Sequence, residues 1–156
     1  MPERSAGILL YRRRDDGLEV LLVHPGGPFF ARKDDGAWSI PKGLYEDGEE
    51  PLDAARREFA EEIGSACPDG EALELGEIRQ KSGKRVLAWA VEGDLDADAI
   101  TSNTFEIEWP PRSGRRQEFP EIDRAAWFPL PAARTKILAA QAEFLARLRG
   151  LSPESR

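Results

Sequence analysis

The chain has 156 residues, of which 40% are hydrophobic and 33% are charged, and this length and composition predict a single soluble domain spanning residues 1–156 with a sizeable core. Its formal net charge of −7 argues against long DNA or RNA as a partner, because proteins that bind the nucleic-acid backbone normally present a basic face. One cysteine, Cys67, excludes an intrachain disulfide; as no signal peptide or membrane-spanning run is recognisable either, we expect a cytoplasmic protein.

The part of the chain before residue 43 predicts short strands joined by turns. Strands are predicted at residues 5–11, 18–23 and 37–40, with turns or loops at residues 12–17, 25–28 and 34–36. His24, the one histidine, follows the second of these strands. We expect a structural or solvent-facing role for it rather than contact with a ligand.

Residues 51–63 predict a helix. Pro51 suits the first helical turn, where its missing N–H is not needed, and Gly64 is a candidate for a left-handed stop. Apolar residues recur at helical spacing, which places one stripe of the helix against a core. The stripe consists of Leu52, Ala55, Phe59 and Ile63.

The same helix carries a group of glutamates on one flank. Glu58, Glu61 and Glu62 are related by i,i+3 and i,i+4 spacing, so their carboxylates lie close together. Like charges at this spacing repel each other, whereas a bound hard cation would make the arrangement favourable. Carboxylate oxygens suit Mg²⁺ or Mn²⁺. The alternative is a solvated acidic helix face.

The stretch around this helix resembles the Nudix box, which reads Gly, five residues, Glu, seven residues, Arg-Glu, an apolar residue, one residue, Glu-Glu, one residue, Gly and an apolar residue. The matching positions are Gly43, Glu49, Arg57, Glu58, Phe59, Glu61, Glu62 and Gly64. Only Ser65 departs from the pattern, and that position concerns packing after the helix. The preceding run Trp38-Ser39-Ile40-Pro41-Lys42-Gly43 is also similar to the approach to the box in Nudix enzymes.

After the box, alternating apolar residues predict further strands, and a stripe at helical spacing predicts a final helix. This stripe consists of Ile137, Leu138, Gln141, Phe144, Leu145 and Leu148. Strands are predicted at residues 72–81, 85–91, 104–109 and 125–130, a closing helix at residues 137–148 ended by Gly150, and a tail at residues 152–156. The proline- and glycine-containing segment 110–121 is predicted to form neither a helix nor a regular strand.

The resemblance implies an α/β fold, namely an α/β/α sandwich with a mixed sheet, and a hydrolase acting on a nucleoside diphosphate linked to another group. It implies a catalytic site formed by Glu58, Glu61, Glu62, Arg57 and a further glutamate. Mg²⁺, with Mn²⁺ as an alternative, would be held by the three helix glutamates and that further one. We favour Glu121 for the further glutamate, with Glu118 in reserve, because Glu121 lies a few residues before a tryptophan-containing strand. Arg57 would organise the site by pairing with Glu49.

Basic residues outside the helix are candidates for binding the phosphates of a small nucleotide substrate. They are Lys42, Lys81, Lys84, Arg112, Arg115 and Arg116. A dinucleoside polyphosphate is the favoured substrate. The alternatives are a nucleoside triphosphate, cleaved to monophosphate and pyrophosphate, and a non-catalytic Nudix domain that only binds nucleotides. The sequence predicts no membrane partner and leaves the oligomeric state open.

Overall fold

The computed structural model describes residues 3–151, so the predicted tail at residues 152–156 lies outside the described residues. The strands are β1 (Arg4–Arg14), β2 (Gly17–Pro25), β3 (Lys42–Leu44), β4 (Ala72–Arg79), β5 (Arg85–Glu92), β6 (Thr104–Glu108), β7 (Arg116–Pro120) and β8 (Ile122–Pro129). The helices are α1 (Pro51–Ile63), α2 (Leu130–Lys136) and α3 (Ala142–Leu151), with 3₁₀ turns η1 (Ala97–Ala99) and η2 (Ala139–Gln141). Within residues 3–151, no helix is long and apolar enough to cross a membrane.

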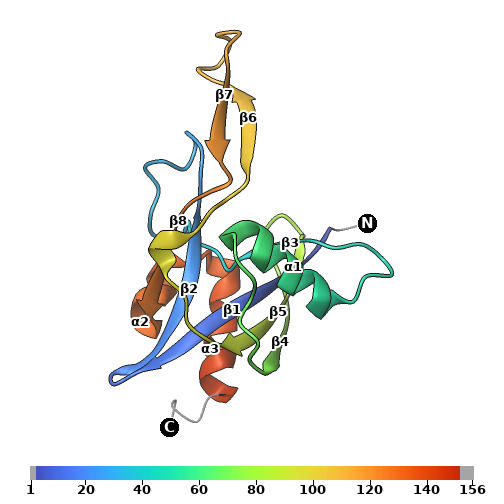
Figure 1. The fold of residues 1–156 in the computed structure, drawn as a ribbon, viewed down its shortest axis with the longest axis vertical. Coiled ribbons are helices and arrows are strands. Elements are labelled where there is room, and N and C mark those ends of the chain that lie inside the picture. Colours follow the sequence, from blue (N-terminus) through green and yellow to red (C-terminus); the bar gives the residue numbers. More distant parts are fainter. Residues whose placement is uncertain (1–2, 152–156) are drawn as a thin grey trace.

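The main sheet is mixed, with strand order β4-β5-β1-β2-β8 and β3 added beside β1 (Figure 1). β1 pairs with β5 in parallel, whereas its pairings with β2 and β3 are antiparallel. β1 is therefore the central strand: its first half carries β3, which leads into the Nudix box.

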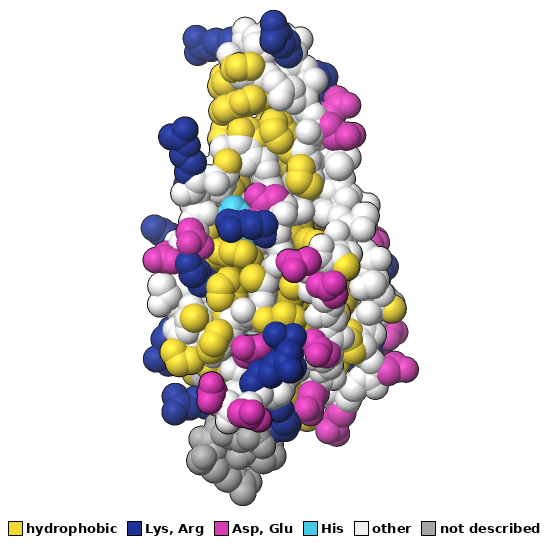
Figure 2. Space-filling model, turned by 60° about the vertical axis from the view of Figure 1, so that its left-hand side comes forward, with side chains coloured by type: hydrophobic (Ala, Val, Ile, Leu, Met, Phe, Trp, Pro, Cys, Tyr) yellow, Lys and Arg dark blue, Asp and Glu magenta, His cyan; other side chains and the backbone are white. Residues whose placement is uncertain are grey.

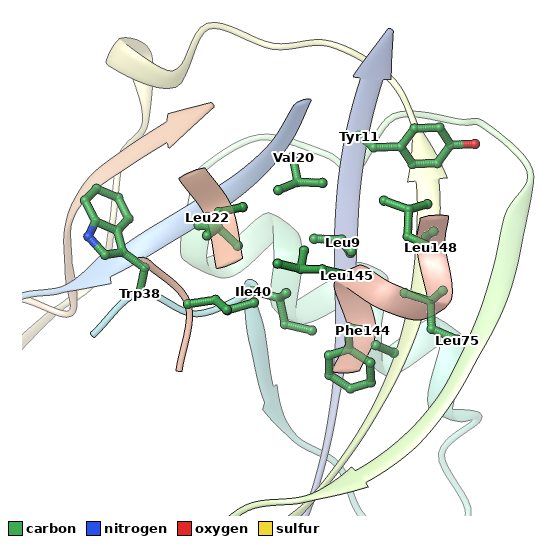
Figure 3. Packing of buried hydrophobic residues seen from close by; sticks show 14 of the residues in the cluster. Leu9, Tyr11, Val20, Leu22, Trp38, Ile40, Leu75, Phe144, Leu145 and Leu148 are labelled. Carbon is green, nitrogen blue, oxygen red and sulfur yellow. The ribbon is translucent and has the colours of Figure 1, made fainter. Parts of the chain in front are cut away.

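Side chains of β1 alternate between two hydrophobic layers, as the pleat of a strand requires. Ile8 and Leu10 lie in the layer that contains the apolar residues of α1. Leu9 and Tyr11 lie in the other layer, which α2 and α3 cover (Figure 3). The sheet thus has helices on both faces, and the predicted α/β/α sandwich with a mixed sheet is confirmed.

Helix α1 begins and ends where its sequence predicts. Pro51 occupies the first turn, and Gly64 adopts φ 88° while its N–H donates to the Ala60 carbonyl. A Cβ atom at Gly64 would also overlap the Thr101 carbonyl oxygen, so both conformation and space require glycine there. The stripe that includes Phe59 and Ile63 is buried against the sheet.

The prediction that residues 110–121 contain no regular strand is wrong. β7 pairs with β6 in an antiparallel ribbon that projects from the body of the protein (Figure 1). The turn of the ribbon contains Pro110, Pro111 and Gly114, which has φ 73°. The residues that follow the turn are therefore free to pair with β6. Phe29, from the loop that follows β2, packs edge-on against Trp109 of the ribbon, with ring centroids 5.4 Å apart. Figure 2 shows hydrophobic side chains along the ribbon and basic ones at its tip.

The predicted closing helix 137–148 is also corrected by the structure. Ile137 is extended, with ψ 151°, and its segment pairs with Trp38 through the bonds Leu138 N–H to Trp38 O, 2.8 Å, and Trp38 N–H to Lys136 O, 3.0 Å. This pairing divides the segment into α2 and α3, and α3 continues past Gly150. The predicted strand at 37–40 is not a regular strand: Trp38 and Ser39 form isolated bridges, to Ile137 and to Val23 respectively. The apolar stripe resembles one helix in the sequence because most of its residues are buried on both sides of the break.

Candidate active site

The Nudix box brings strand β3 against the flank of α1. A Cβ atom at Gly43 would overlap the carboxylate of Glu58, so the close approach of strand and helix depends on glycine. Gly43 is itself fixed by pairing with Ala6 of the central strand. The Glu58 carboxylate is therefore held against the β3 backbone, with its side chain only 15% exposed.

Arg57 connects the loop before the helix with the glutamates on it. Its Nε and Nη2 donate to the two carboxylate oxygens of Glu49 over 3.0 and 3.2 Å, which is the paired geometry that the resemblance implied. Its Nη1 donates to Glu58 over 2.9 Å and to Glu61 over 3.3 Å. The Arg57 guanidinium lowers the pKa of Glu49. Arg57 therefore orients two helix glutamates and anchors the loop.

Glu62 is the most desolvated carboxylate of the group. Burial, with further contributions from the charges of Glu58 and Glu121, raises the pKa of Glu62 to about 8, although the Lys42 backbone N–H donates to it over 3.3 Å. Burial and the neighbouring Glu61 likewise raise the pKa of Glu58. These shifts mean that negative charge is unfavourable here until a cation compensates it.

Lys42 lies in the same partly buried region. Burial and the charge of Lys84 lower the pKa of Lys42, while Glu62 and Glu58 oppose this shift. Lys84 approaches from the turn between β4 and β5 and also forms a 3.8 Å ion pair with Glu3. Of the predicted phosphate ligands, Lys42 is thus close to the helix glutamates, and Lys84 is close enough for its charge to act on Lys42. The third, Lys81, is exposed on the same turn.

Glu121 and the ribbon arginines differ in their placement. Glu121 sits between β7 and β8, close enough for its charge to act on Glu62, and its backbone is fixed by the bond from Gly26 N–H to its carbonyl, 2.8 Å. The turn with Arg112 and Arg115 lies at the far end of the projecting ribbon (Figure 1), so the structure does not bring these arginines to α1. Arg116 forms a 3.0 Å ion pair with Glu106 along the ribbon.

The donor set fits a divalent cation, although the carboxylates do not form a finished cage. Within residues 3–151, no group of three or more His, Cys, Asp or Glu side chains is arranged to hold a metal ion, and Arg57 engages two of the glutamates. Two observations support the fit: the carboxylates are hard oxygen donors, and burial raises the pKa of Glu58 and of Glu62, so a cation beside them would stabilise their charged forms.

Two features of the surroundings have no counterpart among the predicted site residues. His24 is fully buried, with Nδ1 2.8 Å from Asp123 Oδ1 and Nε2 2.6 Å from the Lys33 carbonyl, so its role in the fold is structural. Gln141 is also fully buried. In the sequence, Gln141 is a polar residue at a core position of the apolar stripe predicted for the closing helix.

Comparison with known proteins identifies the family. A model of the NUDIX domain matches residues 1–148. The chain belongs to the Nudix family. RNA pyrophosphohydrolase of Rhodospirillum rubrum is 42% identical to this Nudix domain over 79 residues, which cover 49% of this chain and 44% of the relative. Putative nudix hydrolase 6 of Caenorhabditis elegans is 36% identical over 74 residues, covering 47% of this chain and 26% of the relative. The chain thus matches less than half the length of these curated relatives.

Solved structures resemble the Nudix domain over nearly its whole length. A crystal structure of a C. elegans Ap4A hydrolase binary complex aligns with a TM-score of 0.65 at 22% identity, covering 95% of this chain and 96% of that chain. The NUDIX domain of Shewanella oneidensis NrtR, complexed with ADP ribose, aligns with a TM-score of 0.64 at 18% identity, covering 96% and 88% of the two chains. At these identities, the likeness establishes the fold.

Proposed function

We propose that this Nudix domain is a Mg²⁺-dependent pyrophosphohydrolase that cleaves a phosphoanhydride bond of a nucleoside polyphosphate, with a dinucleoside polyphosphate as the favoured substrate. The observation that carries the proposal is the position of Lys42, whose backbone N–H donates to Glu62 over 3.3 Å and whose side chain lies close enough to the half-buried carboxylates of Glu58 and Glu62 for their charges to act on it. The phosphates of a substrate need a cationic group such as Lys42, and a metal ion between phosphates and protein needs carboxylate oxygens as ligands. This region of the protein supplies the lysine and the carboxylates together.

The reaction adds water to a phosphorus atom, breaks the bond to the bridging oxygen and leaves two phosphorylated products. Glu58, Glu61, Glu62 and Glu121 would hold Mg²⁺, with Mn²⁺ as an alternative. When bound, the cation supplies charge neutralisation for the phosphates and lowers the pKa of coordinated water.

Side chains of the protein bind the phosphates, accept the proton of the attacking water and orient the glutamates. Lys42 and Lys84 bind phosphate oxygens and offset the charge that develops as the bridging bond breaks. A carboxylate of the helix cluster accepts the proton of the attacking water. Arg57 keeps Glu58 and Glu61 oriented and ties them to the loop at Glu49. The single cysteine is compatible with a reaction in the reducing cytoplasm.

A nucleoside triphosphate is the alternative substrate, cleaved to monophosphate and pyrophosphate. The same lysines and carboxylates would serve it, because the reacting phosphates are alike in both substrates. The name of the R. rubrum relative, RNA pyrophosphohydrolase, suggests a third class of substrate, RNA that carries a pyrophosphate bond. The overall charge of −7 speaks against contacts along a long RNA chain, so we favour the small nucleotides.

Product analysis by chromatography distinguishes these substrates. The protein is incubated with Mg²⁺ and, separately, with diadenosine tetraphosphate, ATP and a short oligonucleotide carrying a 5′-triphosphate. We expect ATP and AMP from the dinucleotide, with slower turnover of the other two. Rapid conversion of ATP to AMP and pyrophosphate would move the assignment to the triphosphate. Binding of all three without turnover would support a nucleotide-binding Nudix domain instead.

A further inference from the structure

Gln141 is a buried amide that the proposed chemistry does not use. Within residues 3–151, only Ser5, His24 and Gln141 are polar and buried, and Gln141 is 0% exposed. A buried amide destabilises a protein unless its donors and acceptors find partners. The partners of Gln141 therefore indicate what the residue holds in place.

The Gln141 side chain joins two segments that are distant in the sequence. Its Oε1 accepts from the Ile40 backbone N–H over 3.0 Å. Its Nε2 donates to Ser39 Oγ over 3.1 Å and to Gln80 Oε1 over 3.2 Å. One planar group thus fixes the chain just before the Nudix box relative to the turn between β4 and β5.

The first connection ends two residues before Lys42. Between them, the Pro41 carbonyl accepts from the N–H of Ile8 in the central strand over 3.1 Å. Gln141 on one side and β1 on the other therefore hold the backbone that leads into Lys42. A shift of Ile40 would be passed to Lys42, because no flexible residue separates them.

The second connection reaches the base of the turn that carries Lys84. The Gln80 backbone N–H donates to the Lys84 carbonyl over 2.8 Å, and its own carbonyl accepts from Gly83 N–H over 2.8 Å. Gln80 therefore closes this turn. Lys42 and Lys84 carry like charges that act on each other, so repulsion favours moving the turn outward before phosphate binds.

We propose that Gln141, acting through Gln80, is a positioning residue that holds Lys42 and Lys84 at the spacing needed to bind the phosphates of the substrate together. The proposal rests on the function proposed above. It assigns to Gln141 no contact with substrate. Its contribution is to keep two repelling ammonium groups close enough that one phosphate chain can bind both.

The test uses Gln80→Met, which keeps the length of the side chain and removes the acceptor for Gln141. Gln80 is only partly buried, so we expect this variant to fold, and thermal unfolding checks it. If it fails to fold, Gln80→Leu removes the same acceptor for Gln141 and takes its place. Gln117→Met is the matched control, because that glutamine donates to the Trp109 carbonyl in the ribbon.

Two measurements follow, one of binding and one of turnover. Calorimetry gives the Kd for inorganic tripolyphosphate in the presence of Mg²⁺, and steady-state kinetics gives kcat and KM for diadenosine tetraphosphate or, if it is cleaved faster, ATP. We expect Gln80→Met to raise Kd and KM about three- to tenfold while kcat stays within about twofold, the pattern for loss of uniform substrate binding. The control variant keeps both values.

A double-mutant cycle with Lys84→Met decides whether the effect passes through Lys84. If Gln80 acts by placing this lysine, Lys84→Met weakens tripolyphosphate binding much less in the Gln80→Met background than in the wild type. Fully additive effects, or an unchanged Kd in Gln80→Met, would overturn the proposal. The binding measurement stands apart from turnover: a wild type that binds tripolyphosphate but hydrolyses no nucleotide refutes the proposed function and still tests the role of Gln141.

Discussion

Lys42 and Glu62 meet at the edge of the Nudix box, where the backbone N–H of the lysine donates to Oε1 of the glutamate over 3.3 Å. Burial acts on both side chains, lowering the pKa of Lys42 and raising the pKa of Glu62 to about 8. Neither charge is well solvated in this position. A phosphate beside Lys42 and a cation beside Glu62 would each restore a compensating charge, which is why we place the reaction here.

Gly43→Ala tests whether the closeness of β3 and α1 matters for activity. The added Cβ would overlap the Glu58 carboxylate, and because this carboxylate is the end of a flexible side chain it would rotate away rather than unfold the protein. Displacing a group of the site by about 1 Å can lower turnover by about 100-fold. We expect a loss of this order in kcat/KM with little change in the melting temperature.

Gly150→Ala is the control for that prediction. Nothing lies within 4 Å of a Cβ atom at this position in α3, so activity should be unchanged. Equal activity of Gly43→Ala and wild type would show that the Glu58 carboxylate can move without consequence.

Glu62→Gln should weaken the stabilisation that Mg²⁺ gives to the fold. A ligand present at about 100 times its Kd stabilises the folded state by about 2.7 kcal/mol, which corresponds to about 5–10 °C in melting temperature for a domain of this size. We expect scanning calorimetry to show such a shift for the wild type and a clearly smaller one for Glu62→Gln. Glu143→Gln, on the exposed face of α3, should retain the full shift. Equal shifts in all three proteins would remove Glu62 from the metal site.

Arg57→Lys should affect turnover more than stability. The Arg57 side chain is 41% exposed, and exposed ion pairs contribute less than about 1 kcal/mol. A lysine cannot, however, bind both oxygens of Glu49 and reach Glu58 at the same time. We expect kcat to fall about tenfold while the denaturant midpoint changes little. If Arg57 acts through Glu49, Glu49→Gln will add little to the loss in Arg57→Lys, whereas multiplied losses would indicate separate roles.

Lys84 and Arg112 were both predicted from the sequence to bind substrate, but only Lys84 lies close to Lys42 in the structure. Lys84 acts on Lys42, whereas Arg112 lies in the turn at the end of the ribbon. A hydrogen bond from a charged group contributes about 1.5–3 kcal/mol, so Lys84→Met should raise KM about tenfold or more. Arg112→Met should raise it less than twofold. The reverse order would show that the ribbon reaches the substrate.

The sequence was sufficient where local signals and tertiary structure agree. Helix α1 was bounded correctly because Pro51 and Gly64 determine the backbone at its ends, and because its apolar stripe faces one layer. The break before α3 was missed because it depends on pairing with a distant segment, the chain around Ile137 with Trp38, and local patterns do not reveal such partners. The ribbon was missed for a different reason. Its strand β7 pairs with the neighbouring β6, with Arg116 opposite Glu108, but the prolines and Gly114 that form the turn between them made the whole segment look irregular.

The candidate site also contains features that local sequence predicts and features that only tertiary structure determines. Glu58, Glu61 and Glu62 could be placed together because helical spacing fixes their neighbourhood. The distance of the ribbon arginines from α1 could not be foreseen, since it follows from the direction in which the ribbon projects. The role suggested for Gln141 depends on three hydrogen bonds to residues at least 61 positions away, and the sequence carries no signal for them beyond a glutamine in an apolar stripe.

The proposed metal site and reaction are tested most directly by the rate of diadenosine tetraphosphate cleavage, measured in parallel for wild type and Glu62→Gln, each with Mg²⁺ and with EDTA. We expect rapid turnover for the wild type with Mg²⁺, none with EDTA, and a loss of about two orders of magnitude or more in Glu62→Gln with Mg²⁺, because removing several kcal/mol of transition-state stabilisation has that effect. Equal rates for the two proteins, or a wild-type rate that EDTA leaves unchanged, would contradict this proposal.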